Sequence, residues 1–245
     1  MVAHRQGIAV LEGLIAHGRG EAFDYLLGEE TSAPALVAER AAAAFLVTAK
    51  QPVISVNGNV AALAAKPVAR LAAAIPAQIE VNLFHRTDAR VRRIVQVLRR
   101  AGARDVLGLR PDARIPGLES DRARCHRDGL YTADVVLVPL EDGDRTEALA
   151  RMGKVVIAID LNPLSRTSRT ASVPVVDELA RAVVQIERFA RVLRARPREA
   201  ARIARTYDRT GNLAATYAFI RWRLAELVRT TRASGDRKRP RSRKR

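Results

Sequence analysis

Two short apolar runs with a helix-like stretch between them constrain the fold of this chain more than any other feature. The runs occupy residues 135–140 and 155–159, and both are rich in valine and isoleucine. Runs of this length and composition are typical of strands that are buried on both faces of a parallel sheet. The stretch between them, residues 146–153, has a helical composition and ends on a glycine. Together the three pieces predict a β-α-β unit.

The same alternation of strand-like and helix-like segments continues on both sides of this unit. Further strand-like runs lie at residues 53–56, 79–83, 106–109 and 172–176. Helix-like stretches lie at residues 34–50, 66–75, 89–100, 178–194, 197–207 and 213–229. This alternation predicts a Rossmann-like α/β fold with a mainly parallel, doubly wound sheet and a C-terminal helical cap. We expect a single domain over residues 1–229 and a disordered basic tail over residues 230–245.

Polar side chains cluster directly after both strands of the central unit. The first cluster contains Glu141, Asp142, Asp144 and Arg145, and the second contains Asp160, Asn162, Ser165, Arg166 and Thr167. Ligands of open α/β sheets bind outside the carboxyl ends of the strands, where carboxylates, amides, hydroxyls and arginines suit a nucleotide. The stretch contains no Gly-x-Gly-x-x-Gly motif, so its spacing alone does not predict a dinucleotide site.

Two further segments carry polar or glycine-rich patterns. Asn57-Gly58-Asn59 follows the strand-like run at 53–56. Asn-Gly often forms a hairpin turn, but the helix-like stretch at 60–64 favours a loop between a strand and a helix. Residues 16–22 contain glycines on both sides of Arg19, and we expect a loop there that leads into a helix beginning at Glu21. Such a loop would present backbone N–H groups to an anion, and an ordinary turn between helices is the alternative.

The formal charge of +17 raises the question of nucleic-acid binding. The tail holds eight of the 43 basic residues and one of the 26 acidic ones, so its removal lowers the net charge from +17 to +10. We expect the tail to make non-specific contacts with polyanions. The remaining basic residues are scattered, and aromatic residues make up only 4% of the chain. A specific nucleic-acid-binding module is therefore the less favoured alternative.

The single cysteine and the absence of long apolar runs predict a cytoplasmic protein. Cys125 has no second cysteine with which to form an internal disulfide, and this fits a reducing compartment. No neighbouring base marks Cys125 as a nucleophile. No apolar run approaches the roughly 18 residues of a membrane span, and no signal peptide opens the chain.

Several segments resemble the archaeal phosphopantothenate synthetases, which are 4-phosphopantoate–β-alanine ligases of coenzyme A synthesis. The resemblance lies in residues 13–28, 52–60, 114–119, 141–152 and 159–166. These blocks follow the order of the family, and the similarity extends from about residue 7 to residue 225. Another α/β nucleotide enzyme, such as a dehydrogenase, is the alternative, and the missing Gly-x-Gly-x-x-Gly motif is evidence against it.

The resemblance implies a reaction and a set of nucleotide contacts. ATP, 4-phosphopantoate and β-alanine would give 4′-phosphopantothenate, AMP and pyrophosphate through an acyl adenylate. The family's ATP contacts correspond here to Arg19, Asp160, Leu161, Asn162, Arg166, Thr167, Glu178 and Leu179. Glu178 replaces an asparagine that is common in the family, so a backbone contact is expected at that position. The resemblance also implies a homodimer and Mg²⁺ held largely by substrate oxygens, and we assign no residue as a metal ligand.

The catalytic candidates are inferred from their places at the strand ends. They are Asn57, Asn59, Asp142, Asp144 and Arg145, with Glu141 beside them. We expect these residues to contact phosphopantoate, β-alanine or the metal ion. Family members also carry a further N-terminal segment with a second ATP-contacting arginine. Either the true start of the chain lies upstream of Met1, or Arg5 is the nearest substitute for that arginine.

Overall fold

A six-stranded sheet forms the centre of the molecule. The computed structural model describes the backbone of residues 2–237 and the side chains of residues 2–233. The strands of the sheet are β1 (Pro52–Val56), β2 (Gln78–Val81), β3 (Val106–Leu107), β6 (Val135–Pro139), β7 (Val155–Ile159) and β8 (Val173–Val175). Their order across the sheet is β3-β2-β1-β6-β7-β8, and every neighbouring pair is parallel. The predicted parallel α/β fold is therefore confirmed.

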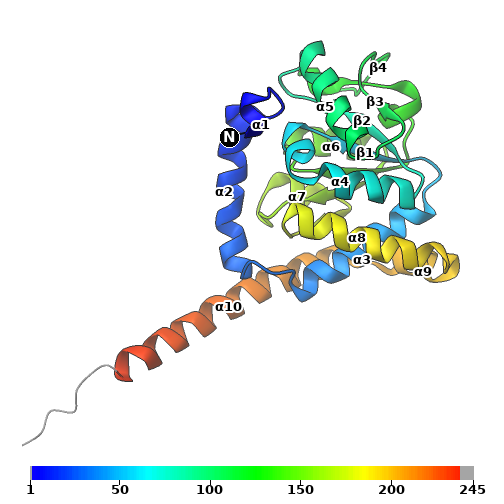
Figure 1. The fold of residues 1–245 in the computed structure, drawn as a ribbon. Coiled ribbons are helices and arrows are strands. Elements are labelled where there is room, and N and C mark those ends of the chain that lie inside the picture. Colours follow the sequence, from blue (N-terminus) through cyan, green and yellow to red (C-terminus); the bar gives the residue numbers. More distant parts are fainter. Residues whose placement is uncertain (1, 238–245) are drawn as a thin grey trace, which may run out of the picture.

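Helices cover both faces of this sheet (Figure 1). The α-helices of the described chain are α1 (Val2–Arg5), α2 (Leu11–Leu27), α3 (Ala33–Thr48), α4 (Gly58–Ala74), α5 (Asp88–Arg100), α6 (Gly143–Arg151), α7 (Arg166–Thr170), α8 (Leu179–Arg194), α9 (Pro197–Thr206) and α10 (Arg209–Arg237), of which α1, α2 and much of α10 lie beside the sheet (Figure 1). Between β3 and β6, residues 113–131 form an excursion that we call the arm. It contains a two-stranded antiparallel sheet of β4 (Ala113–Arg114) and β5 (Arg124–Cys125), the 3₁₀ turn Asp121–Ala123 and the helical turn Arg127–Tyr131.

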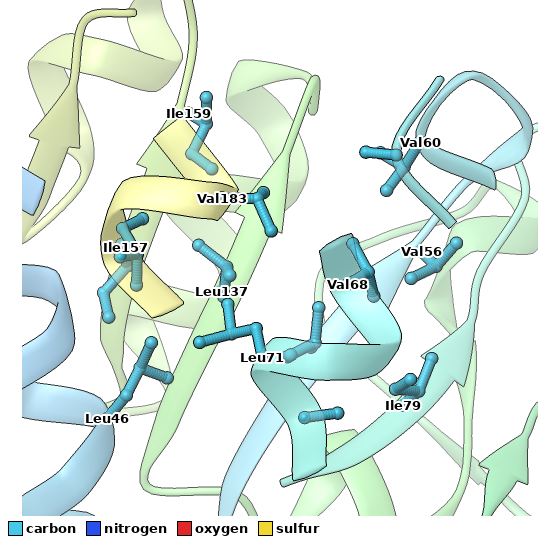
Figure 2. Packing of buried hydrophobic residues seen from close by; sticks show 14 of the residues in the cluster. Leu46, Val56, Val60, Val68, Leu71, Ile79, Leu137, Ile157, Ile159 and Val183 are labelled. Atoms are coloured by element: carbon cyan, nitrogen blue, oxygen red, sulfur yellow. The ribbon is translucent and has the colours of Figure 1, made fainter. Parts of the chain in front are cut away.

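The core has two layers because alternate residues of a strand face opposite sides of the sheet. Leu137, Ile157 and Ile159 face the side where α3, α4, α5 and α8 pack (Figure 2). Val136 and Val156 face the other side and pack with residues of α6 and the arm. Since both faces are covered, β6 is buried along its whole length. This explains why the strands of the central unit are continuous apolar runs.

One N-terminal expectation is wrong. Gly18, Arg19 and Gly20 lie inside α2, so the expected glycine-rich loop does not exist. Helical hydrogen bonding over a long segment outweighs a cost of about 1 kcal/mol for each internal glycine. The break comes instead at Gly28, whose φ of 94° suits the left-handed end of α2. The two expected helical stretches at 60–64 and 66–75 correspond to the two parts of α4, which are separated by a kink at Ala64.

The C-terminal boundary of the helical region also differs from the expectation. Helix α10 continues to Arg237, so residues 230–237 of the expected disordered tail are helical. The first proline beyond this point is Pro240, and the intervening sequence contains no other residue that must end a helix. The expected polyanion contacts of residues 238–245 lie outside the described residues. None of the described helices combines the length and the apolar character needed to cross a membrane.

A buried carboxyl group lies among charged residues at the junction of α3 and α8. Glu39 of α3 is completely buried, and burial together with the neighbouring Asp177 carboxylate raises the pKa of Glu39 to about 9. Asp177 accepts hydrogen bonds from the Thr31 hydroxyl at 2.7 Å and from Arg181 Nη2 at 2.9 Å. Arg181 also pairs with Asp24 of α2 at 2.5 Å. Glu39 is therefore a neutral acid at pH 7, next to a group of charges that joins α2, α3 and α8.

We expect the Glu39→Gln variant to lose part of the pH dependence of stability. A raised pKa in the folded state contributes stability that is complete below the unfolded pKa, near 4.5, and is lost as pH rises towards 9. The free energy of unfolding of the parent protein should thus fall between pH 5 and pH 9, by up to about 1.4 kcal/mol per pH unit. Urea unfolding across this range should show a shallower fall for Glu39→Gln. The exposed Glu30→Gln variant is the control, and equal slopes for parent and Glu39→Gln would contradict the prediction.

Candidate active site

Two adjoining cavities lie at the carboxyl-terminal edge of the parallel sheet. The first, of about 380 Å³, lies beyond β6 and β7 and has α2 as one wall. The second, of about 250 Å³, lies beyond β1 and β2. Ala16, Asn59, Arg122 and Leu140 line both cavities, so the two are neighbours across a shared wall. This is the edge at which open α/β sheets bind their ligands.

One face of α2 forms a wall of the first cavity. Ala16, Arg19, Gly20 and Phe23 are spaced by three or four residues and line this cavity together. The charge of Arg19 acts on the Asp160 carboxyl, so the two side chains face the same space. Phe23 was not among the predicted site residues, because a loop was expected at residues 16–22 where α2 continues. The i, i+3, i+4, i+7 spacing was the signal that could have identified it.

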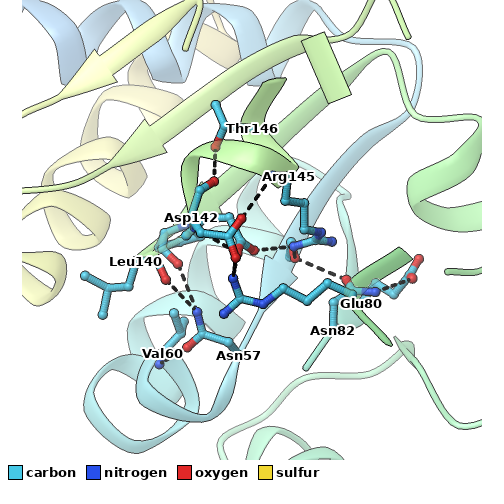
Figure 3. A network of polar contacts seen from close by, with 12 residues as sticks. Asn57, Val60, Glu80, Asn82, Leu140, Asp142, Arg145 and Thr146 are labelled. Atoms are coloured by element: carbon cyan, nitrogen blue, oxygen red, sulfur yellow. Dashed lines mark hydrogen bonds and ion pairs between the residues drawn. The ribbon is translucent and has the colours of Figure 1, made fainter. Parts of the chain in front are cut away.

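The backbone is strained where β6 ends. Leu140 has a φ of 51°, a conformation that costs a non-glycine residue about 1–3 kcal/mol. Asn57 Nδ2 donates to the carbonyl oxygens of Leu140 at 2.9 Å and Pro139 at 3.3 Å. Asn57 Oδ1 accepts from the backbone N–H groups of Asn59 and Val60 at the start of α4 (Figure 3). Both ends of the Asn57 amide therefore hold the ends of β1 and β6 together.

A buried ion pair lies beneath the first cavity. Glu141 Oε2 pairs with Nη1 of Arg145, and the two side chains are 2% and 1% exposed. Burial acts to raise the pKa of Glu141, but the charges of Arg145 and Arg122 outweigh burial and hold the pKa below its usual value. Glu141 is thus an ionised carboxylate. Arg145, expected to contact substrate, is covered by protein on all sides.

The ion pair continues as a chain of hydrogen bonds to the arm. Arg145 Nη1 donates to the Ser55 hydroxyl at 2.9 Å, and Ser55 donates to Asn82 Oδ1 at 3.1 Å. Asn82 Nδ2 donates to Glu80 Oε1 at 3.0 Å (Figure 3). The Glu80 carboxylate also accepts from the backbone N–H groups of His126 at 3.1 Å and Leu130 at 2.8 Å. This series of hydrogen bonds therefore connects the ends of β6, β1 and β2 to the arm.

The loop after β7 holds the polar groups on the other side of the first cavity. Asp160 accepts from the Asn162 N–H at 2.9 Å and from the Ser165 hydroxyl at 2.5 Å. Burial raises the pKa of Asp160, although these hydrogen bonds and the charge of Arg19 act to lower it. Thr167 is buried and donates to the Glu141 carbonyl oxygen at 2.9 Å, so the loops after β6 and β7 are joined.

The starts of α6 and α7 approach each other closely beside this loop. A Cβ atom at Gly143 would lie 2.6 Å from Cβ of Arg166, so only glycine fits at this position. Asp142 accepts from the Arg145 N–H at 3.0 Å and caps α6. Arg166 extends to solvent and pairs with Asp144 at 2.8 Å. The cavity therefore has a partly exposed arginine at its rim.

The structure brings most of the predicted site residues to the cavities. Arg19, Asn59, Asp142, Asp160, Leu161, Asn162, Arg166 and Thr167 line the first cavity, and Asn57 and Asn59 line the second. Asp144 and Arg145 line neither cavity, since one is exposed at the rim and the other is buried beneath it. Their contacts with ligands, like those of the lining residues, stay predictions.

Glu178 and Leu179 also lie outside the cavity walls. Glu178 caps α8 by accepting from the backbone N–H groups of Ala180 at 2.8 Å and Arg181 at 3.0 Å. Leu179 is buried in the main core. Both side chains thus have structural roles. Any contact of these two residues with a nucleotide would have to come from their backbone groups.

Arg122 is the main cavity residue that could not be predicted from the sequence. It lies in the arm, lines both cavities, and pairs with Glu141 at 2.5 Å and with Asp142. Nothing in its local sequence distinguishes it from the other arginines nearby. Its position follows from the fold of the arm over the sheet edge.

The arrangement suits a ligand that carries several negative charges. Arg19, Arg122 and Arg166 approach the first cavity from three different segments. Arginine binds phosphate oxygens through paired N–H groups. Among the described residues, no group of three or more His, Cys, Asp or Glu side chains is placed to hold a metal ion. The site can thus position and neutralise phosphates, but it presents no cluster of metal ligands.

We expect Arg145→Met to lower stability strongly although the side chain lies outside the cavities. Removing one partner of a buried ion pair leaves an incompletely compensated charge and costs about 3–5 kcal/mol. Arg151→Met is the matched control on the same helix, because the Arg151 side chain is 63% exposed. Urea unfolding should separate the two variants, and equal midpoints would contradict a structural role for Arg145.

Comparisons with known proteins identify relatives of this chain. A family model described as phosphopantothenate/pantothenate synthetase matches residues 34–223. The chain is 62% identical over 185 residues to a 4-phosphopantoate–β-alanine ligase of Methanospirillum hungatei, covering 76% of this chain and 75% of the relative. It is 52% identical over 228 residues to a ligase of the same name from Methanosarcina mazei, covering 93% and 90% of the two chains. For the relative of this name from Thermococcus kodakarensis, the identity is 51% over 225 residues, covering 91% and 86%.

Identities of this size over most of both chains, together with the match to the family model, establish a common family. The region that the family model matches includes the strand ends and the arm that line both cavities, whereas α2, the remaining wall, lies before it. The chain therefore belongs to the phosphopantothenate/pantothenate synthetase family.

Proposed function

We propose that the protein is an ATP-dependent 4-phosphopantoate–β-alanine ligase that forms 4′-phosphopantothenate for coenzyme A synthesis. The observation that carries this function is 51–62% identity to relatives of that name over most of the chain. The arginine-rich cavity at the carboxyl ends of the strands supports it, because the substrates are phosphorylated anions.

ATP occupies the first cavity in this proposal. Arg19 and Arg166 contact the phosphates from opposite walls, α2 and α7. Asp160 and Asn162 contact the nucleoside, since a carboxyl and an amide can bond ribose hydroxyls. Leu161 and Thr167, which follow β7, also contact ATP. The backbone of Glu178 and Leu179, which follow β8, provides the remaining contacts with ATP.

Phosphopantoate occupies the second cavity. Arg90, His85 and Arg122 line this cavity, and Glu12 is the one acidic residue among its lining residues. Burial and then the charge of Arg122 lower the pKa of Arg90, which means that two guanidinium groups face a small common space. Such a space favours an anion. The shared wall brings the acid substrate next to ATP.

The proposed reaction has two steps, formation of an acyl adenylate and its reaction with β-alanine. The carboxylate oxygen of phosphopantoate forms a bond to the α-phosphorus of ATP, and the bond to the bridging oxygen breaks with its electrons leaving on pyrophosphate. The β-alanine amine then bonds to the acyl carbon, the bond to the adenylate oxygen breaks, AMP leaves, and the nitrogen releases a proton. Neither step needs a protein nucleophile, so the enzyme acts by positioning and by neutralising charge.

Mg²⁺ would be bound together with ATP in this proposal. Phosphate oxygens would supply most of its ligands, and Asp142, one of the carboxylates that line the cavity, would add one. The ion would offset charge on the polyphosphate. Asp142 also pairs with Arg122, so its charge is partly neutralised already.

A homodimer is supported by apolar surface on α10. Leu213, Tyr217 and Ile220 pack against residues of α2 and β8, and the same helical stripe continues to Leu224 and Leu227. These last two side chains are 44% and 49% exposed, on the part of α10 that extends away from the body (Figure 1). Exposed leucines in line with a buried stripe mark a surface for a second copy of the chain.

The cytoplasm is the compartment that we propose for the enzyme. Cys125 is a free thiol, and burial raises its pKa to about 12, so it is protonated and unreactive. A free cysteine of this kind fits a reducing compartment.

Product analysis tests the proposed function. AMP and pyrophosphate should form only when ATP, phosphopantoate and β-alanine are all present, and ADP with orthophosphate would exclude the adenylate route. Arg19→Ala should raise the Michaelis constant for ATP about 10- to 100-fold, since a charge-assisted bond to phosphate contributes roughly 1.5–3 kcal/mol. Arg188→Ala, an exposed arginine of α8 outside both cavities, should have no effect. Unchanged ATP use by Arg19→Ala would remove α2 from the nucleotide site.

Size-exclusion chromatography with light scattering measures the mass in solution and tests the proposed dimer. We expect twice the chain mass of 26.9 kDa for the parent protein. A charge at the exposed end of the apolar stripe, Leu227→Glu, should give the monomer mass. Val192→Glu is the control, since Val192 is 50% exposed on α8, away from this stripe. A monomeric parent protein, or a dimeric Leu227→Glu variant, would contradict this interface.

A further inference from the structure

The position of Arg122 between the two cavities sets it apart from the other arginines of the site. Four residues line both cavities, and among the described residues Arg122 is the only charged one of them. It comes from the 3₁₀ turn of the arm, far along the chain from the strand ends that form the cavity floors. A single cation therefore lies in the wall that the two cavities share.

The arm is fixed to the sheet edge on both sides of Arg122. Main-chain bonding joins Ala113 to Cys125 and Arg114 to Arg124 in the small antiparallel sheet. Asn82 Nδ2 donates to the Arg124 carbonyl oxygen at 3.1 Å, so the residue two positions beyond Arg122 is tied to the end of β2. The guanidinium carbon of Arg122 also lies 5.2 Å from the centre of the Phe84 ring. The position of Arg122 is therefore set by the fold.

The guanidinium group retains donors beyond its ion pairs. Nη1 pairs with Glu141 at 2.5 Å and with Asp142. The Arg122 side chain is only 15% exposed, and its buried Nε has no hydrogen-bond partner among the described residues. Arginine has five N–H donors in a planar fork, which can engage two anions at once. The two carboxylates engage Nη1, and Nη2 makes no hydrogen bond to protein among the described residues, so Nη2 is the donor left for ligands.

The charges around the second cavity favour an anion on that side of Arg122. Arg122 acts on Arg90 across this cavity, and Arg90 already donates to the Ile8 carbonyl oxygen at 3.0 Å and the His85 carbonyl oxygen at 2.8 Å. The opposing acidic group is Glu12. On the side of the first cavity, Arg122 faces a space that Arg19 and Arg166 also approach.

We propose that Arg122 contacts both substrates at once and offsets the repulsion between the acid substrate's carboxylate and the α-phosphate of ATP. This proposal rests on the ligase function proposed above. Both reacting groups are anions, and they must approach within bonding distance before the first bond forms. A fixed cation between them stabilises that approach and the charge that develops on the α-phosphate. Arg122 stays protonated throughout and transfers no proton.

The first step alone provides the test. Phosphopantoate-dependent exchange of labelled pyrophosphate into ATP measures adenylate formation without β-alanine. Arg122→Ala should lower the rate of this exchange at saturating substrates by about 10²–10³-fold, the usual effect of removing one donor to a developing oxyanion. The stabilisation of the variant by ATP should persist in a thermal-shift assay, because Arg19 and Arg166 remain. Arg114→Ala is the matched control, an exposed arginine of the same arm.

Two further measurements separate contact with substrate from support of the fold. Arg122→Lys keeps a charge beside Glu141 and Asp142 but lacks the planar fork, so it should fold and still show a reduced exchange rate. Added methylguanidinium should partly restore the exchange by Arg122→Ala, which it would not do for a fold defect. Wild-type exchange by Arg122→Lys together with no rescue of Arg122→Ala would overturn the proposal. No exchange by the parent protein and by Arg114→Ala would instead contradict the ligase function, and the role of Arg122 with it.

Discussion

The buried pair of Glu141 and Arg145 is the interaction on which the rest of the site depends. It places two opposite charges beneath the first cavity, and each is linked to a different part of the fold. Arg145 reaches Ser55 and, through Asn82, the Glu80 carboxylate that holds the arm. Glu141 pairs with Arg122 of the arm at 2.5 Å. Nε and Nη2 of Arg145 are buried without a hydrogen-bond partner among the described residues, so the bonds of Nη1 to Glu141 and Ser55 are the contacts that compensate its buried charge.

Each cavity is assembled from segments that are distant in the sequence. The first has walls from α2, from the start of α4, from the loops after β6 and β7, and from the arm, and the second adds the segment after β2. The parallel sheet makes this possible because all its strands end at one edge. Side-chain bonds then join these segments: Asn57 joins the ends of β1 and β6, Thr167 joins the loops after β6 and β7, and Arg122 joins the arm to Glu141. The geometry therefore depends on side-chain bonds as well as on the sheet.

The distribution of charge in the site follows from the chemistry of its substrates. ATP and an organic acid phosphate repel each other, and the proposed reaction brings their anionic groups into contact. Arginines from three segments surround the first cavity, and two guanidinium groups face the second. Glu141 and Asp142 limit the excess of positive charge by pairing with Arg122. The site thus carries fixed cations that are themselves held by carboxylates, which keeps them oriented for a ligand.

The sequence by itself determined the sheet and the edge at which ligands bind. An apolar run such as Val155–Ile159 indicates a strand that is buried on both faces of a parallel sheet. The strands of such a sheet end at the same edge, so the position of Asp160 and Asn162 at the cavity could be predicted. The helical face of α2 was misread because glycine is only a weak local signal. Only the tertiary structure decided that Arg145 is buried, that Arg122 lies between the cavities and that Glu178 caps a helix. The physical reason is that strand and helix patterns are local, whereas the partner of a charge is set by contacts between segments that only folding brings together.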